Sequence, residues 1–170
     1  RIIPREIGLL RNLQVLVLAR NKLTTLPVEI GLLNSLINLD LEANLLETLP
    51  SEVGQLKQLQ FLNLKDNNLR ILPEEIGALQ KLESLNLERN RLGSLPIEIA
   101  QMKKLKWLDV GRNEFTILPP EISQLSELQD LYFDNNQISH LPNSLLQYLK
   151  QLQVVGLKGN PIPFPPELRE

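Results

Sequence analysis

The sequence predicts an α/β solenoid, a right-handed coil with a parallel sheet on its concave face and short helices or 3₁₀ turns on its convex face. Proline recurs every 23 residues in this chain of 170 residues, at positions 4, 27, 50, 73, 96, 119 and 142. Asparagine keeps the same step from position 21 to position 136, and leucines recur between the two. A fixed period of this length indicates stacked structural repeats.

Each unit contains one short strand. In the first unit, Leu16 and Leu18 alternate with Val15 and Val17, which is the period-two pattern of a strand. A single strand has no partner within its own unit. It must therefore pair with the equivalent strand of the next unit, which produces a parallel sheet.

The second half of each unit returns the chain to the next strand. Pro27 lacks an N–H and has a fixed φ, which suits the first turn of a short helix or 3₁₀ segment. Ile30 and Leu33 follow at helical spacing and are expected to point into the core. We expect a core substitution such as Leu85→Ala to cost about 2–5 kcal/mol.

The repeated asparagine lies where the chain leaves the strand and turns. Backbone groups there are buried outside the sheet, and an amide side chain can hydrogen-bond to them. Asn67→Leu would leave such groups without partners, at about 1–3 kcal/mol. We predict a structural ladder formed by Asn21, Asn44, Asn67, Asn90, Asn113, Asn136 and, shifted by one residue, Asn160.

The consensus of the units is Leu-x-x-Leu-x-Leu-x-x-Asn-x-Leu, followed by Leu-Pro-x-Glu-Ile-Gly-x-Leu, as in residues 59–69 and 72–79. Over essentially the whole chain this resembles the leucine-rich-repeat family. Within its 23-residue subclass, the repeats are most similar to those of bacterial, leptospiral-type proteins. The eukaryotic intracellular Ras-pathway and polarity scaffolds have very similar repeats and are the alternative.

The resemblance implies a protein-interaction module that binds a macromolecular partner on its concave face. Bacterial members are thought to be exported or surface-displayed and to engage host molecules, so a host protein and an extracellular location are the expectation. The alternative is a structural or scaffolding arm of a larger intracellular signalling protein, with a cytoplasmic location.

We expect a single repeat domain over residues 1–170 with about seven units. The chain opens in the second half of a unit, which predicts that further repeats or a cap precede it in a longer parent protein. The stretch 145–149 is lengthened and absorbs the one-residue shift of Asn160. Residues 161–170 are a proline-rich tail or the start of another unit, and self-association through the solenoid ends is also open.

Specificity in such a coil must lie on outward strand residues, because the inward leucines are alike in every unit. Phe61, Trp107 and Tyr132 are the aromatic members of the outward columns, and we predict that they form the binding centre. Gly111 is expected to leave room beside Trp107 and Tyr132. The alternative is that these rings merely cover sheet surface. The surrounding polar residues assigned to the binding face are Asp40, Asn63, Asn86, Glu88, Asp109, Arg112, Asp130 and Asp134.

Composition and spacing argue against other classes of function. The net charge of −2 does not favour nucleic acid, no run of about 18 apolar residues could span a membrane, and there is no cysteine. Asp40 and Asp109 would lie three strands, roughly 14 Å, apart, beyond the about 5–9.5 Å of a glycosidase pair. His140 has no nucleophile at a recognisable spacing. We therefore predict no enzyme activity and no cofactor.

One metal site is considered. Asp109, Asp130 and Asp134 share one face of adjacent strands and could offer oxygen ligands to Ca²⁺. The favoured alternative is an acidic contact patch balanced by Arg89 and Arg112, so no metal is assigned.

Overall fold

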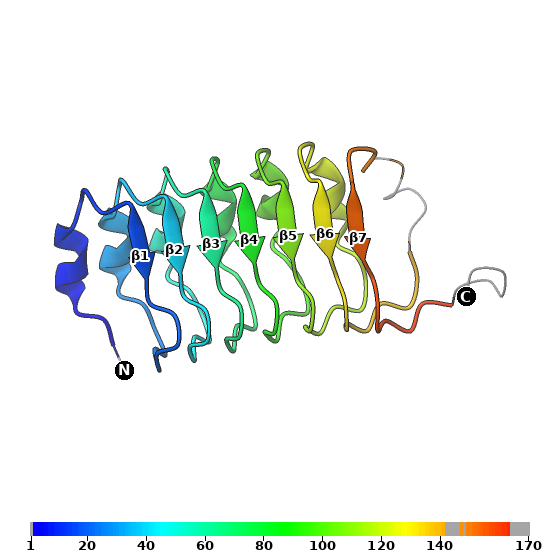
Figure 1. Cartoon of the computed structure of the whole chain (residues 1–170), viewed down its shortest axis with the longest axis horizontal. Helices are drawn as coiled ribbons and strands as arrows, with labels where there is room; N and C mark the ends of the chain where they lie inside the picture. Colours follow the sequence, from blue (N-terminus) through cyan, green and yellow to red (C-terminus); the bar gives the residue numbers. More distant parts are fainter. Residues whose placement is uncertain (1, 142–146, 148, 164–170) are drawn as a thin grey trace.

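Seven short strands form one parallel sheet in sequence order in the computed structural model, which describes residues 2–141, 147 and 149–163 (Figure 1). Each strand pairs in register with the strand 23 or 24 residues further on, so Val15 lies opposite Asn38 and Asp130 opposite Val154. The predicted solenoid with a parallel sheet is confirmed. The strands are β1 (Val15–Val17), β2 (Asn38–Asp40), β3 (Phe61–Asn63), β4 (Ser84–Asn86), β5 (Trp107–Asp109), β6 (Asp130–Tyr132) and β7 (Val154–Gly156).

Short 3₁₀ helices form the opposite layer, and each begins immediately after a repeat proline. The proline φ angles lie between −69° and −60°, the range to which the ring restricts this residue. The proline carbonyl then accepts the first helical bond, as from Ile30 N–H to Pro27 at 3.0 Å. These helices are η1 (Arg5–Leu9), η2 (Val28–Leu32), η3 (Ser51–Gln55), η4 (Glu74–Ala78), η5 (Ile97–Gln101) and η6 (Pro120–Gln124).

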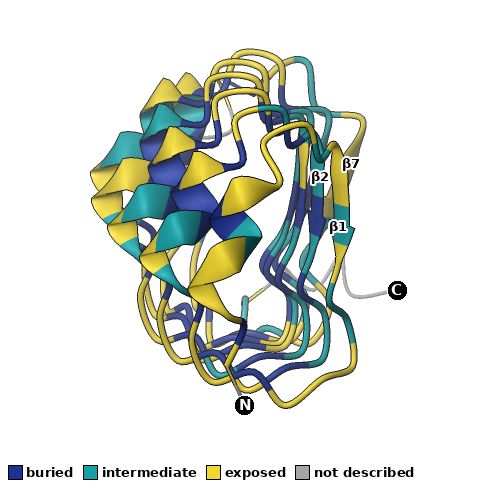
Figure 2. Ribbon diagram, turned by 90° about the vertical axis from the view of Figure 1, so that its left-hand side faces the viewer, coloured by how far each residue is buried: buried dark blue, intermediate teal, exposed yellow. Residues whose placement is uncertain are grey.

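The core lies between the two layers, where Figure 2 shows the buried residues of the strands facing those of the helices. Leu85 and Ile76 are examples, and both are fully buried. In the fifth and sixth coils Phe115 and Phe133 take two of the leucine positions. Their rings pack edge to face, with centroids 5.4 Å apart.

The turn asparagines bond across neighbouring turns. The Asn67 amide nitrogen donates to the carbonyl oxygens of Leu41 and Leu64, both at 3.0 Å. Its oxygen accepts the Leu46 N–H at 3.1 Å. The same pattern holds for Asn44, Asn90, Asn113 and Asn136, all of them buried, whereas Asn160 is partly buried. At the first turn, Asn21 is exposed and donates only within its own coil.

The residue before each asparagine has a left-handed backbone, which the sequence pattern did not predict. Six such residues have φ between 53° and 57°, and Gly159 precedes Asn160 with φ of 75°. Residues other than Gly, Asn and Asp rarely adopt this conformation. Bonds to the next coil hold it in place, as from Asp66 N–H to the Glu88 carbonyl at 2.9 Å. The six are Arg20, Ala43, Asp66, Arg89, Arg112 and Asn135.

The periodic glycines allow the 3₁₀ helices to stack closely. A Cβ added to Gly54 would lie 2.5 Å from the Glu75 carbonyl oxygen of the next coil. We therefore expect Gly54→Ala to lower the free energy of unfolding by about 1–3 kcal/mol through overpacking. Urea denaturation would measure it. Alanine already occupies the equivalent position at Ala100, so Ala100→Gly is the control and should cost about 1 kcal/mol or less. A neutral Gly54→Ala would contradict the close approach.

Three expectations fall wholly or partly outside the described residues. They concern Pro142, the lengthened stretch 145–149 and the tail beyond Pro163.

Candidate functional site

The outward side of the sheet, called here the open face, carries three rows of side chains. The strand register aligns the first two rows, and the third lies two residues beyond the second. The first row is Val15, Asn38, Phe61, Ser84, Trp107, Asp130 and Val154. The second row is Val17, Asp40, Asn63, Asn86, Asp109, Tyr132 and Gly156. The third row is Ala19, Glu42, Lys65, Glu88, Gly111, Asp134 and Lys158.

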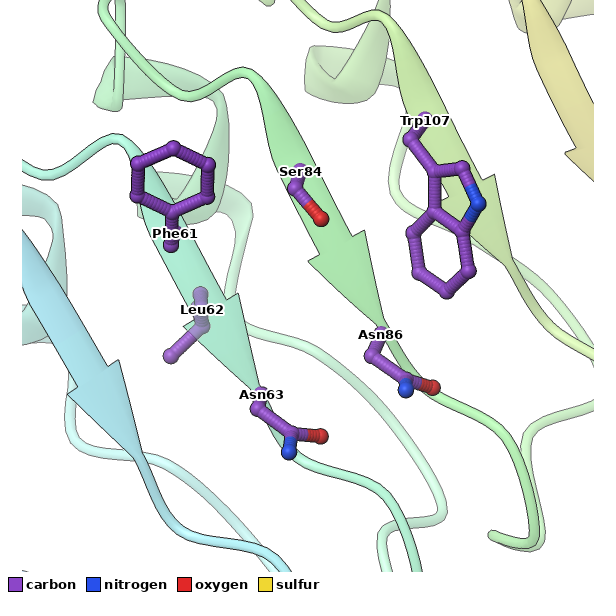
Figure 3. A pocket seen from close by; sticks show the side chains of 6 residues that line it. All are labelled: Phe61, Leu62, Asn63, Ser84, Asn86 and Trp107. Atoms are coloured by element: carbon purple, nitrogen blue, oxygen red, sulfur yellow. The ribbon is translucent and has the colours of Figure 1, made fainter. Parts of the chain in front are cut away.

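A hollow of about 360 Å³ lies on the open face between Phe61 and Trp107. Ser84 stands between the two rings in the first row, and its small side chain leaves the space open. The rings lie two strands, about 10 Å, apart. Figure 3 shows both with their flat faces turned toward the viewer, and the amides of Asn63 and Asn86 beside them. Phe61 is 43% exposed although it is large and apolar.

Trp107 and Tyr132 form an aromatic pair beside this hollow. Their ring centroids are 5.8 Å apart and their planes are inclined at 50°. The role expected for Gly111 is wrong, because Gly111 lies in the third row and a Cβ there would contact Asp109 and Asp134. The glycine beside Tyr132 is Gly156, where a Cβ would lie 2.8 Å from the Tyr132 ring.

The second-row amides and carboxylates also hold the end of each strand. An oxygen of Asp40, Asn63, Asn86 and Asp109 accepts the N–H two residues further on, at 2.8–3.2 Å. The Asn63 amide nitrogen in turn donates to Glu42. The Asn86 amide nitrogen has no such partner in the part of the chain that the structure describes. It is therefore a donor available at the hollow.

The ion pairs of the open face converge on Glu88. Its carboxylate lies 2.6 Å from Lys65, 3.4 Å from Arg112 and 4.0 Å from Arg89. Arg89 also lies 3.4 Å from Asp66. The expectation that Arg89 and Arg112 balance the aspartates of β5 and β6 is therefore wrong, because both pair with Glu88 of the β4 coil and Arg89 also pairs with Asp66 of the β3 coil.

The aspartates around the aromatic pair are left without such partners. Across residues 2–141 and 149–163, no salt bridge involves Asp109, Asp130 or Asp134. Burial raises the pKa of the Asp109 carboxyl above its ordinary value, and Glu88 and Asp134 raise it further. The Gly111 N–H and Lys65 oppose this rise. The ionised form of Asp109 is thus disfavoured in the fold.

We expect Asp109→Asn to stabilise the protein at neutral pH by up to about 1 kcal/mol, because it removes like-charge repulsion. An asparagine can still accept the Gly111 N–H, as Asn86 accepts that of Glu88. Since the folded-state pKa of Asp109 is raised, its ionisation destabilises the fold above that pKa. The gain should therefore shrink as the pH falls through the raised pKa, where the wild-type carboxyl is neutral too.

Urea denaturation at neutral and acidic pH would measure this difference. The matched control is Asp40→Asn, which keeps the same strand-end hydrogen bond in β2 but lies away from Glu88 and Asp134. An equal gain from both substitutions would contradict the role of the acidic neighbours.

The residues considered for catalysis or metal binding do not form a site among the described residues. Asp40 and Asp109 are on β2 and β5, three strands apart as expected. His140 is exposed, with its Nδ1 3.2 Å from the Ser139 hydroxyl. Within the described residues, no three or more His, Cys, Asp or Glu side chains are grouped so that they could hold a metal ion. None of the described helices is long and apolar enough to cross a membrane.

A coil of strand, asparagine turn and proline-led return defines the class of leucine-rich solenoids. The chain belongs to the leucine-rich repeat family, since the model of a leucine-rich repeat region matches residues 1–89 and 51–162. No curated protein matches the chain significantly.

Solved structures show the same architecture. A leucine-rich-repeat protein of Leptospira interrogans is 39% identical over 97% of this chain, with a TM-score of 0.75, which confirms the expected similarity to leptospiral proteins. The ectodomain of the Arabidopsis thaliana receptor kinase GASSHO1/SCHENGEN3 is 29% identical over 93% of the chain, with a TM-score of 0.72. An internalin of Listeria monocytogenes shares the fold at 24% identity over 91%, with a TM-score of 0.77. The chain spans only 48%, 26% and 43% of these proteins, respectively.

Proposed function

We propose that this chain is a protein-interaction module that binds a peptide or protein on its open face, centred on Phe61, Trp107 and Tyr132. The hollow between Phe61 and Trp107 is the observation that carries the proposal. A few side chains that become desolvated on binding, often Trp and Tyr, supply most of the energy in protein interfaces. A concave, partly apolar surface with a few polar groups is also the usual form of a ligand site.

Polar groups around the hollow supply directional contacts. Ser84, with its hydroxyl, and Asn86, with its amide nitrogen, both line it. Both can donate hydrogen bonds to backbone carbonyls of an extended partner. The other residues assigned to the face, which surround this centre in the second and third rows or beside them, are Asp40, Asn63, Glu88, Asp109, Arg112, Asp130 and Asp134.

Similar proteins support a peptide or protein as the partner. The GASSHO1/SCHENGEN3 ectodomain was solved in complex with CASPARIAN STRIP INTEGRITY FACTOR 2. A plant peptide hormone receptor, 31% identical over 94% of this chain, was solved in complex with RGF2. The similarity to the leptospiral protein favours a bacterial chain. The partner proposed for such a chain is a host protein. No catalytic step is proposed for these residues.

We expect the triple substitution Phe61→Ala, Trp107→Ala and Tyr132→Ala to weaken partner binding at least about 30-fold, the loss expected from a single interface hot spot. The test is quantitative affinity capture from host serum and cell extract. Partners retained by the wild-type chain are then titrated against the variant.

A matched control removes three exposed apolar side chains outside the open face. Ile71, Ile97 and Ile117 are 62%, 68% and 51% exposed and belong to the return segments. Their triple alanine variant should retain the captured partners. Equal recovery of every partner by both variants would contradict the proposal and favour the scaffolding-arm alternative.

A further inference from the structure

We infer that the partner segment bound at the open face is basic and places an arginine side chain over Trp107, beside Asp109. This inference rests on the proposed function, because it names the chemistry of the partner that the same face would take.

Charge is distributed unevenly between the open face and the rest of the chain. The three rows contain six carboxylates and two lysines, and Arg89 and Arg112 reach Glu88 on the same face, which gives the face a charge of −2. The whole chain also has a charge of −2, so all other residues together carry no net charge. The open face is therefore the acidic side of the molecule and attracts a cationic partner. The charged residues of the three rows are Asp40, Glu42, Lys65, Glu88, Asp109, Asp130, Asp134 and Lys158.

Among the described residues, five row carboxylates lack an ion pair, and three of them, Asp109, Asp130 and Asp134, surround the aromatic pair. Glu88 is already paired with Lys65, Arg89 and Arg112. Asp130 lies opposite Trp107 in the sheet register, and Asp109 lies opposite Tyr132. Neither aspartate has an ion-pair partner among the described residues, so carboxylates lie on both strands that carry the rings.

The physical chemistry of these groups favours arginine over other side chains. A guanidinium stacks on the face of a tryptophan ring, and it can donate hydrogen bonds to a carboxylate in the same pose. A carboxylate accepts such a charge-assisted bond more strongly than a neutral one. The Asp109 oxygen that accepts the Gly111 N–H at 2.8 Å fixes the orientation of the carboxyl group. An acidic partner would be repelled by the unpaired aspartates.

The hollow fits the backbone that would carry this arginine. Its volume of about 360 Å³ lies next to Trp107 on the side away from Tyr132 and Asp130. The Asn86 amide nitrogen borders the hollow and can donate to a peptide carbonyl. The partner's arginine and its neighbouring backbone would thus occupy adjacent positions across strands β4 to β6.

The test is a selection of displayed random dodecapeptides on the full chain, followed by titration of the enriched peptides. We expect enriched sequences to be basic and to share an arginine. Replacing that arginine by lysine should weaken binding about fivefold, and replacing it by glutamine about tenfold or more. The chain variants Trp107→Ala and Asp109→Asn should each weaken binding about tenfold. Glu74→Gln, which removes an exposed carboxylate of η4 on the opposite layer, should not.

Salt provides a second measurement. Raising the ionic strength from about 0.01 to about 0.15 M shortens the Debye length from about 30 to about 8 Å. Binding of the arginine peptides should weaken severalfold over this range, and the weakening should be smaller for Asp109→Asn.

The outcomes separate the two proposals. Enriched peptides that are neutral or acidic but lose binding to the Phe61, Trp107 and Tyr132 triple alanine variant would overturn the basic partner and leave the proposed function standing. Peptides that bind this variant as well as the wild type would overturn the proposed function itself. A selection that enriches nothing would count against both.

Discussion

Replacing Asn67 by leucine is expected to lower the free energy of unfolding by at least about 2 kcal/mol. The substitution nearly preserves the shape of the side chain but removes every hydrogen bond of the amide. The Leu46 N–H then remains buried between two coils without a partner, while the carbonyl oxygens of Leu41 and Leu64 each lose one of two amide donors and keep the other. The unpaired N–H costs about 1–3 kcal/mol and each lost carbonyl bond adds about 0.5–1.5 kcal/mol, so the total reaches beyond the cost expected from the sequence alone.

The control for this prediction is the same substitution in the first coil. Asn21 is exposed, and its amide donates only to Leu18 and Ala19 in its own coil. Asn21→Leu should therefore cost less than about 1 kcal/mol, since water replaces the lost partner. Urea denaturation of both variants measures the difference. Equal losses would mean that the asparagine acts within its own turn and does not join neighbouring coils.

Much of the fold could be predicted because each unit repeats the same local rules. Alternating residues specify the strand, and a proline with fixed φ specifies the start of the return segment. The left-handed residue before each asparagine could not be predicted. At Arg20, Ala43, Arg89 and Arg112 the side chain has no preference for positive φ, and the conformation is imposed by bonds to the adjoining coil.

The candidate site could be predicted only to the level of rows. A period of two placed Trp107 and Tyr132 on adjacent strands of one face, and their rings are in contact. The hollow could not be predicted, because it depends on the rotamers of Phe61 and Trp107 on either side of a small Ser84. The predicted pairing of Arg89 and Arg112 with the aspartates of β5 and β6 was also wrong, because the conformations of these long side chains bring them to Glu88 and Asp66 instead.

Asp109 links stability to the proposed function. Its ionised form is disfavoured in the free protein by burial and by its acidic neighbours, and a cationic partner would relieve that repulsion. Asp109→Asn is expected to stabilise the fold and weaken binding at once. Such opposing effects are typical of residues that serve a binding site at the expense of stability.

Replacing Leu85 by alanine is expected to lower the free energy of unfolding by about 2–5 kcal/mol. Leu85 is fully buried at the centre of β4 and lies between Leu62 of β3 and Leu108 of β5. The substitution leaves a cavity that neighbours on both sides cannot fill, because the sheet and the stacked helices hold each coil at a fixed spacing. In a solenoid a central coil contributes two interfaces, so a defect there weakens both.

The equivalent leucine of the first strand provides the control. Leu16 is only partly buried and has a neighbouring strand on one side alone. Leu16→Ala should therefore cost about half as much or less, because less contact area is lost and one interface is affected. Urea denaturation followed by circular dichroism would measure both, with hydrogen exchange reporting which coils open. A Leu85→Ala variant no less stable than Leu16→Ala would mean that the coils are not coupled in the way that the register of the sheet requires.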